Sequence, residues 1–234
     1  MDSRRGNIYF LGISIIIAFF ILGYFFYISR QDSQTIKVVG MSKQLYTSDI
    51  IKWTVSIENF AYSYNLSDGY KKIIKKRKQF ITYLVSKGIN KDDISFKPIT
   101  SYQIYNNGKP TDKYRFTQTI IVVSNKVELI EKIALEDMID SGFLLRSSYF
   151  EYYYSKIDSL KKELLSSATE NAKQRALKML EGTGLNIDRI KSIRAGVFQI
   201  TEPYSNEVSS YGVYNTRVKK KEIKVTVHVL YTLK

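Results

Sequence analysis

The hydrophobic pattern of the chain begins with one unbroken apolar run. Residues Ile8 to Ile28 carry no charged side chain and are mostly aliphatic or aromatic. The run is about as long as the ~20 residues that a helix needs to cross a bilayer. It therefore predicts a transmembrane helix over residues 8–28.

The charges that flank this run predict its orientation. Arg4 and Arg5 precede it, whereas only Arg30 follows closely before Asp32. Because basic residues stay on the cytoplasmic side, we expect a cytoplasmic N-terminus over 1–7, a linker over 29–34 and an extracytoplasmic domain over 35–234. This is the topology of a single-pass protein of the inner (cytoplasmic) membrane, with its domain in the periplasm or outside the cell.

A cleaved signal peptide is the alternative to an uncleaved anchor. Signal peptides have a shorter apolar region of about 7 to 15 residues and small residues at the cleavage site. The run in this chain is longer and ends in the bulky residues Phe25, Phe26 and Tyr27. The pattern favours the anchor and leaves a secreted form, released by cleavage, as the second possibility.

Beyond the run, alternating and helical patterns follow one another. Strands are predicted at 35–39 and 50–57, paired with each other around 40–48. A helix with an apolar stripe follows from Leu66 and ends at Gly88, where a glycine can cap it. Two extended segments at 94–105 and 114–123, joined by the turn residues 106–110, then predict a hairpin.

A second cycle of the same kind completes the chain. It comprises a short helix over 127–139, a strand over 143–154 and a long helix from Ile157 to the glycines at 182 and 184. Ala168, Ala172 and Ala176 share one face of that long helix. Closing strands are predicted at 187–200 and 222–233, on either side of a polar and mobile loop over 202–221. This order predicts an α+β domain in which helices cover a largely antiparallel sheet.

Composition narrows the chemistry of the exported part. The chain has no cysteine, which excludes disulfides, a lipid-modified cysteine and thiolate metal sites. It carries 36 basic and 22 acidic residues; without Arg4, Arg5, Arg30 and Asp2 these become 33 and 21, a formal charge of +12. Such a charge favours anionic surroundings, namely lipid headgroups or wall polymers, and the anchor argues against a nucleic acid partner.

No catalytic, cofactor-binding or metal-binding residues are predicted. His228 is the only histidine, and it alternates with Val225, Val227 and Val229, so it belongs to the opposite face of its strand. One histidine cannot form a triad or a histidine metal cluster without suitable partners. The glycines form no phosphate-binding pattern. The main rival hypothesis is an enzyme acting on envelope polymers, which would require convergent carboxylates or an activated hydroxyl.

Two basic clusters are predicted first as solvated surfaces, and contacts with an anionic lipid or wall polymer are the alternative interpretation. The first lies opposite the apolar stripe of the first domain helix and comprises Lys71, Lys72, Lys75, Lys76 and Lys78. The second borders the polar loop and comprises Arg217, Lys219, Lys220, Lys221 and Lys224.

Tyrosine is abundant, with 19 residues in the chain. Tyrosines outside a core suit subunit interfaces, because each offers a large contact area with a polar tip. Core packing and the binding of sugar or peptide are the alternatives. The candidate interface residues of a homo-oligomer are Tyr152, Tyr153, Tyr154, Tyr204, Tyr211 and Tyr214.

The order of several short motifs resembles the SIMPL-domain family over Thr35 to Leu233. These motifs are Ile36 to Gly40, Asp49, Lys87-Gly88-Ile89, Ser141-Gly142, the alanine helix and the closing run Val225 to Val229 with Tyr231. Ser42 and Ser48 depart from the glycine and proline of the family pattern. The resemblance implies an envelope protein of poorly defined function without known catalytic residues; some members are linked to oxidative-stress defence and some form large homo-oligomers. We therefore expect a non-enzymatic envelope protein that acts by self-assembly or binding.

Overall fold

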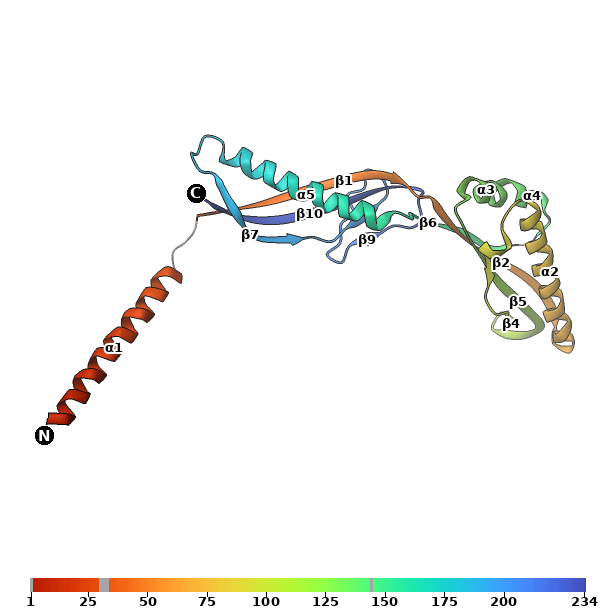
Figure 1. Ribbon diagram of the computed structural model, residues 1–234. Helices are drawn as coiled ribbons and strands as arrows, with labels where there is room; N and C mark the ends of the chain where they lie inside the picture. The colour runs from red at the N-terminus through yellow and green to blue at the C-terminus, as the bar shows by residue number, and fades with distance from the viewer. Residues whose placement is uncertain (1, 30–33, 144) are drawn as a thin grey trace. The chain divides into compact units, whose positions relative to one another are not determined.

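The computed structural model describes residues 2–29, 34–143 and 145–234 (Figure 1). Contacts divide the chain into two compact units. One comprises Met1–Gly40, Thr169–Arg194 and Val227–Lys234, and the other comprises Met41–Ala168 and Ala195–Thr226. Most of the predicted linker over 29–34, including Arg30, lies outside the described residues.

Helix α1, Asp2–Ser29, contains the whole N-terminal apolar run. Its large apolar side chains between Ile13 and Ile28 are exposed by 47 to 79%. Among the residues that the structure describes, no helix meets both the length and the hydropathy of a membrane span. The anchor over 8–28 stays a prediction.

Two sheets make up the rest of the fold, as the α+β prediction requires. The first, the β2 sheet, has the order β3-β5-β2-β6, with β4 also paired to β5. All of its pairs are antiparallel. Its strands are β2 (Ile50–Tyr62), β3 (Ile94–Phe96), β4 (Thr100–Asn106), β5 (Lys109–Ser124) and β6 (Leu145–Tyr153).

The predicted pairing of the first two strands is wrong. Strand β1, Thr35–Thr47, belongs to the other sheet, while β2 pairs with β5 over twelve positions and with β6 at its other edge. Around the junction, the Ser48 amide donates to the Lys219 carbonyl at 2.9 Å and the Asp49 amide to Tyr153 at 3.1 Å. Because these two amides donate to carbonyls far away in the sequence, the chain passes from one sheet to the next without forming a local hairpin.

Helix α2, Leu66–Ser86, packs on the β2 sheet with Ile73, Phe80 and Leu84 fully buried. Its bounds agree with the prediction, but Leu66, at the start of the expected stripe, is 37% exposed. Gly69 allows the close approach, since a Cβ there would lie 2.3 Å from the Phe116 ring. The remaining helical segments of this part are η1 (Ser63–Asn65), η2 (Lys91–Asp93), α3 (Val127–Lys132), the π-helix η3 (Ile133–Asp137) and α4 (Met138–Asp140).

The predicted hairpin and helix end are confirmed. Asn107 and Gly108 adopt φ angles of +48° and +76°, which suits the tight turn between β4 and β5. Gly88 has a φ of +94° just after α2. The extended segment predicted at 94–105 consists of two short strands, β3 and β4, which both pair with β5.

The second sheet, the β10 sheet, has the order β1-β10-β8-β9, and β7 also pairs with β10. Besides β1 it contains β7 (Ile187–Ala195), β8 (Gln199–Thr201), β9 (Val213–Tyr214) and β10 (Lys220–Leu233). The single strand predicted over 187–200 is thus two strands. They separate at Gly196, whose amide donates to the Thr226 carbonyl at 2.8 Å and where a Cβ would lie 2.6 Å from the Thr226 hydroxyl.

Helix α5, Ile157–Leu180, runs along β1 and β10 (Figure 1). The guanidinium of Arg175 donates to the Val39 carbonyl on β1 at 2.7 Å. Ala168, Ala172 and Ala176 are completely buried, which confirms the predicted packing face. Small side chains at every fourth position let the helix lie close to its support.

Candidate interaction surface

The segment between β8 and β10 is tied to the sheet at several points. Strand β9 pairs with β8 in parallel. The Gln199 side chain donates to the Ser209 carbonyl at 2.7 Å and accepts from the Ser209 amide at 3.2 Å, and Lys224 donates to the Ser205 carbonyl at 3.0 Å. The loop predicted over 202–221 is therefore shorter than expected, since Lys220 and Lys221 lie in β10, and hydrogen bonds fix its path.

Two residues of this segment have backbone conformations that constrain it further. Gly212 has a φ of +87°, and a Cβ there would lie 2.8 Å from the Phe198 carbonyl oxygen, so only glycine fits. Tyr204 has a φ of +63°, which is uncommon for a residue with a side chain. Tyr204 holds this conformation with its side chain exposed.

The tied segment presents apolar side chains to solvent. Tyr204 is 87%, Val208 76% and Tyr211 95% exposed. We call residues 202–212, with these three side chains, the tyrosine loop. An ordered segment that exposes large apolar side chains together is typical of a contact surface.

A hollow of about 480 Å³ lies beside the tyrosine loop. Met41 and Val197, which are 47% and 43% exposed, line it together with Val208. Its volume falls in the range of about 300 to 1,000 Å³ that is usual for ligand pockets. We call it the apolar hollow. The loop and the hollow place a projecting aromatic group next to a concave apolar surface.

The family model named SIMPL, described as a protein of unknown function, matches residues 36–232. The chain belongs to the SIMPL family. The match begins in β1 and ends in β10, so both sheets and the tyrosine loop are parts of the SIMPL domain. A search of curated proteins returns no match.

The other tyrosines predicted for an interface of the SIMPL domain differ in exposure. The prediction that Tyr152 lies at an interface is wrong. Tyr152 is 8% exposed and lies in the core, where its hydroxyl donates to the Glu131 carboxylate at 2.8 Å. Burial, followed by that hydrogen bond, raises the pKa of Tyr152. Tyr153 and Tyr154 are half-buried, the latter against the Tyr46 ring at 5.0 Å, and Tyr214 is 48% exposed. Only Tyr204 and Tyr211 of the six are fully available to a partner.

The basic face predicted on α2 is largely present. Lys71, Lys72, Lys75 and Lys78 are exposed, although Lys72 lies 3.7 Å from the Asp68 carboxylate. Lys76 is half-buried and donates to the Glu58 carbonyl at 2.9 Å. Four of the five lysines are thus placed to meet an anionic surface, whereas Lys76 serves the fold.

The second basic cluster is mostly used inside the SIMPL domain. Lys219 binds Glu128 and Glu131 at 2.9 and 3.0 Å, and Lys224 binds Glu222 at 2.8 Å. Lys221 is only 1% exposed and donates to the Tyr152 carbonyl at 2.5 Å. Burial lowers the pKa of Lys221 from 10.5 to about 8. These three lysines are structural, and no signal in the sequence distinguishes them from surface lysines.

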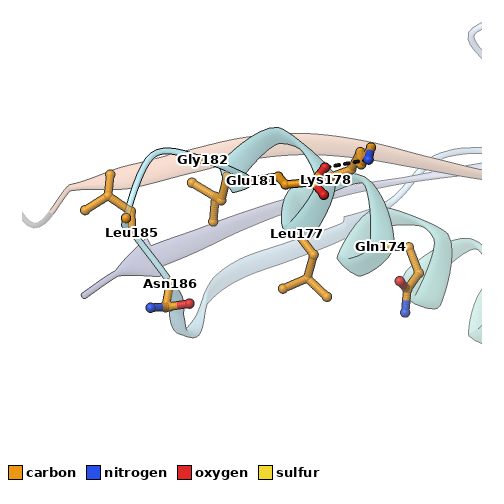
Figure 2. A pocket seen from close by; sticks show the side chains of 9 residues that line it. Gln174, Leu177, Lys178, Glu181, Gly182, Leu185 and Asn186 are labelled. Carbon is orange, nitrogen blue, oxygen red and sulfur yellow. Dashed lines mark ion pairs between the residues drawn. The ribbon is translucent and has the colours of Figure 1, made fainter.

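A further hollow of about 470 Å³ lies where α5 ends (Figure 2). Its charged pair, Lys178 and Glu181, lies 2.5 Å apart and is satisfied within the hollow. Thr183 donates to the Leu180 carbonyl through both its amide and its hydroxyl. Gly182 and Gly184 have positive φ angles and end the helix, as predicted. The geometry is that of a helix terminus.

The described residues contain no group of three or more metal-ligating side chains. His228 is exposed, whereas Val225, Val227 and Val229 are buried, as its place in the strand predicted. Asp137, the last residue of η3, pairs with Lys87 at 2.8 Å.

Proposed function

We propose that this SIMPL protein is a membrane-anchored, non-enzymatic component of the cell envelope that acts by self-association through the tyrosine loop. The observation that carries the proposal is the exposure of Tyr204, Val208 and Tyr211 on a segment fixed by hydrogen bonds beside the apolar hollow. Large exposed aromatic groups are the residues that most often anchor protein interfaces.

The rigidity of the loop supports this proposal energetically. Association costs conformational entropy for every side chain and loop that must be ordered. In the tyrosine loop much of that entropy is lost on folding, because Ser205, Ser209 and Gly212 are held by hydrogen bonds within the domain. A partner therefore meets a preformed apolar surface.

A second copy of the chain is the partner that fits best. The projecting tyrosines and the apolar hollow are different surfaces of one molecule and are complementary in character. Contacts between two different patches produce rings when the rotation closes. A common membrane would also raise the effective concentration of the copies and strengthen a weak contact.

The membrane anchor and the location of the domain outside the cytoplasm are parts of this proposal. They are supported by the uncharged run Ile8 to Ile28, by the exposed apolar side chains of α1 and by Arg4 and Arg5 before it. The basic face of α2 is a secondary contact for anionic lipid or wall polymer.

The test is the size of the full chain in detergent, measured by analytical ultracentrifugation at tens of micromolar. We expect a species larger than a monomer, and the double variant Tyr204→Ser with Tyr211→Ser should shift it toward the monomer. Tyr105→Ser is the matched control, because Tyr105 is 63% exposed but lies on β4. A wild-type chain that is monomeric under these conditions would contradict the proposal.

A further inference from the structure

A third hollow, of about 410 Å³, lies on the β10 sheet and differs in chemistry from the other two. Three strands contribute to it: Lys37 comes from β1, Ser192 and Arg194 from β7, and His228 from β10. The buried Val229 and the partly buried Leu230 complete its lining. We call it the cationic hollow.

The alternation of β10 shows which face of the sheet carries the hollow. Val227, Val229 and Tyr231 are buried and share one face of the strand. His228 is exposed and therefore points to the opposite face. Lys37, Ser192 and Arg194 are exposed as well, so the polar groups of the hollow are open to a ligand.

The charge of the hollow is uncompensated. No acidic side chain lines it, and in the described part of the chain its three basic side chains make no ion pair or side-chain hydrogen bond. The basic residues Lys43 and Lys224 of the same sheet, by contrast, both pair with Glu222. A carboxylate further along β7, that of Asp188, accepts a hydrogen bond from the Thr232 hydroxyl at 3.0 Å.

From this arrangement we infer that the cationic hollow binds the phosphate of an anionic lipid headgroup. An ammonium, a guanidinium, an imidazole and a hydroxyl are all donors to phosphate oxygens, and arginine binds phosphate in a two-point geometry. Leu230 adds an apolar wall beside these donors. Such a site suits a group that carries a negative charge next to a hydrocarbon chain.

The position of Lys37 in the sequence identifies the membrane as the source of the phosphate, and this step rests on the anchor of the proposed function. Lys37 follows Ile28, the last residue of the apolar run, by nine positions. A fully extended chain spans at most about 3.3 to 3.6 Å per residue, so Lys37 stays within about 30 Å of the membrane surface. The tether thus keeps the cationic hollow near the lipid headgroups.

The experiment is native mass spectrometry of the full chain in detergent, titrated with phosphatidylglycerol. We expect bound lipid on the wild type and a loss of affinity in the double variant Lys37→Gln with Arg194→Gln. Basic groups at a membrane surface contribute about 1 kcal/mol each, so the loss of two corresponds to roughly 30-fold. Circular dichroism of each variant checks that it is folded.

Two control variants remove the same charge elsewhere. Lys173→Gln with Lys191→Gln changes exposed lysines of the same unit, and Lys91→Gln with Lys109→Gln changes exposed lysines of the other unit. Both should retain binding. An equal loss in all three double variants would mean that net charge alone attracts the lipid, and that result would overturn the site.

Inorganic phosphate separates the two sources of the ligand. We expect it to compete with the lipid only at concentrations far above that of the lipid; competition at equal concentration would overturn the assignment to a headgroup. A reporter fused after Lys234 tests the anchor separately, since it should be active only outside the cytoplasm. An active reporter without lipid binding would contradict the proposed site and support the anchor. An inactive reporter with lipid binding would support the site and contradict the anchor.

Discussion

Lys221 shows how one residue can make the fold sensitive to pH. Its ammonium is buried, donates to the Tyr152 carbonyl and lies 5.9 Å from the centroid of the Tyr214 ring. Burial disfavours the charged form, which is why the pKa of Lys221 falls from 10.5 to about 8. In the unfolded chain the lysine regains its ordinary pKa.

The sign of the effect follows from proton binding. Between pH 8 and 10.5 the unfolded chain binds more protons at Lys221 than the folded chain does, so this residue makes the fold more stable as the pH rises. Below pH 8 both states are protonated and the full penalty remains. Lys221→Met removes the titration and keeps most of the side-chain volume.

We expect the free energy of unfolding of wild type relative to Lys221→Met to rise by about 2 kcal/mol between pH 8 and pH 10. Urea unfolding of both proteins at the two pH values measures it. The contribution of tyrosine titration to the free energy of unfolding cancels in this comparison, because the tyrosines are the same in both proteins. A difference that does not depend on pH would show that Lys221 titrates normally.

Asp49 joins the start of β2 to the start of α5. One carboxylate oxygen accepts from the Ser155 amide at 2.7 Å and the other from the Ser155 hydroxyl at 2.5 Å. Burial alone would raise the pKa of Asp49, but these two hydrogen bonds outweigh it and hold the pKa below 3.8. The stabilisation is present above pH 3.8 and is lost as the pH falls through the lower value of the folded state.

Asp49→Ala should lower the free energy of unfolding by about 1 to 3 kcal/mol at pH 7, the usual contribution of hydrogen bonds to a charged group. Ser155→Ala should lower the free energy of unfolding by less, because the hydrogen bond from the backbone amide of residue 155 to Asp49 remains. Thermal unfolding of both single variants and the double variant forms a mutant cycle. If the two losses simply add, the residues do not act together.

At the scale of the element, the alanine face of α5 sets a strict limit on size. Ala172 is completely buried, so Ala172→Leu must displace its neighbours and should cost about 1 to 3 kcal/mol in the free energy of unfolding. Lys173→Leu is the matched control at the next, exposed position. Chemical unfolding of the two variants should separate them clearly, and equal stabilities would argue against close packing.

The helices were more predictable than the sheets, for a physical reason. A helix is held by local hydrogen bonds, so the stripe and the glycine cap are enough to predict α2 and α5. A strand is completed by partners far away in the sequence, and the alternation in β2 does not reveal whether β1 or β5 will be that partner. The pairing of β2 with β5 and β6 was accordingly missed.

The candidate surface divides in the same way. Tyr204 and Tyr211 stand among polar residues in a loop, and sequence alone indicates that such rings lie outside a core. Tyr152 lies in a run of aromatic residues in which alternate positions face the core, and the run does not show which alternate set is buried. The cationic hollow could not be predicted, because its residues come from three separate strands.

At the scale of the whole molecule, the anchor is the prediction with the widest consequences. Ile16→Arg with Ile17→Arg places two charges at the centre of the apolar run, and each costs about 2.5 to 3.5 kcal/mol on insertion scales. We expect the variant to be lost from the membrane fraction. Ser3→Arg with Asn7→Arg is the control, since it adds the same charge before the run. Unchanged extraction of the first variant would count against a spanning helix.

The strand order also determines when the domain can fold during its synthesis. Strand β10 lies between β1 and the pair β7 and β8, yet it comes last in chain order among the described strands. Strand β1 cannot pair with β10 until the ribosome has released residues 220–233, which lie about 180 positions further along the chain. Such distant pairing slows folding and leaves open strand edges meanwhile. A nonsense mutation before the codon for Lys220 would therefore remove the centre of this sheet.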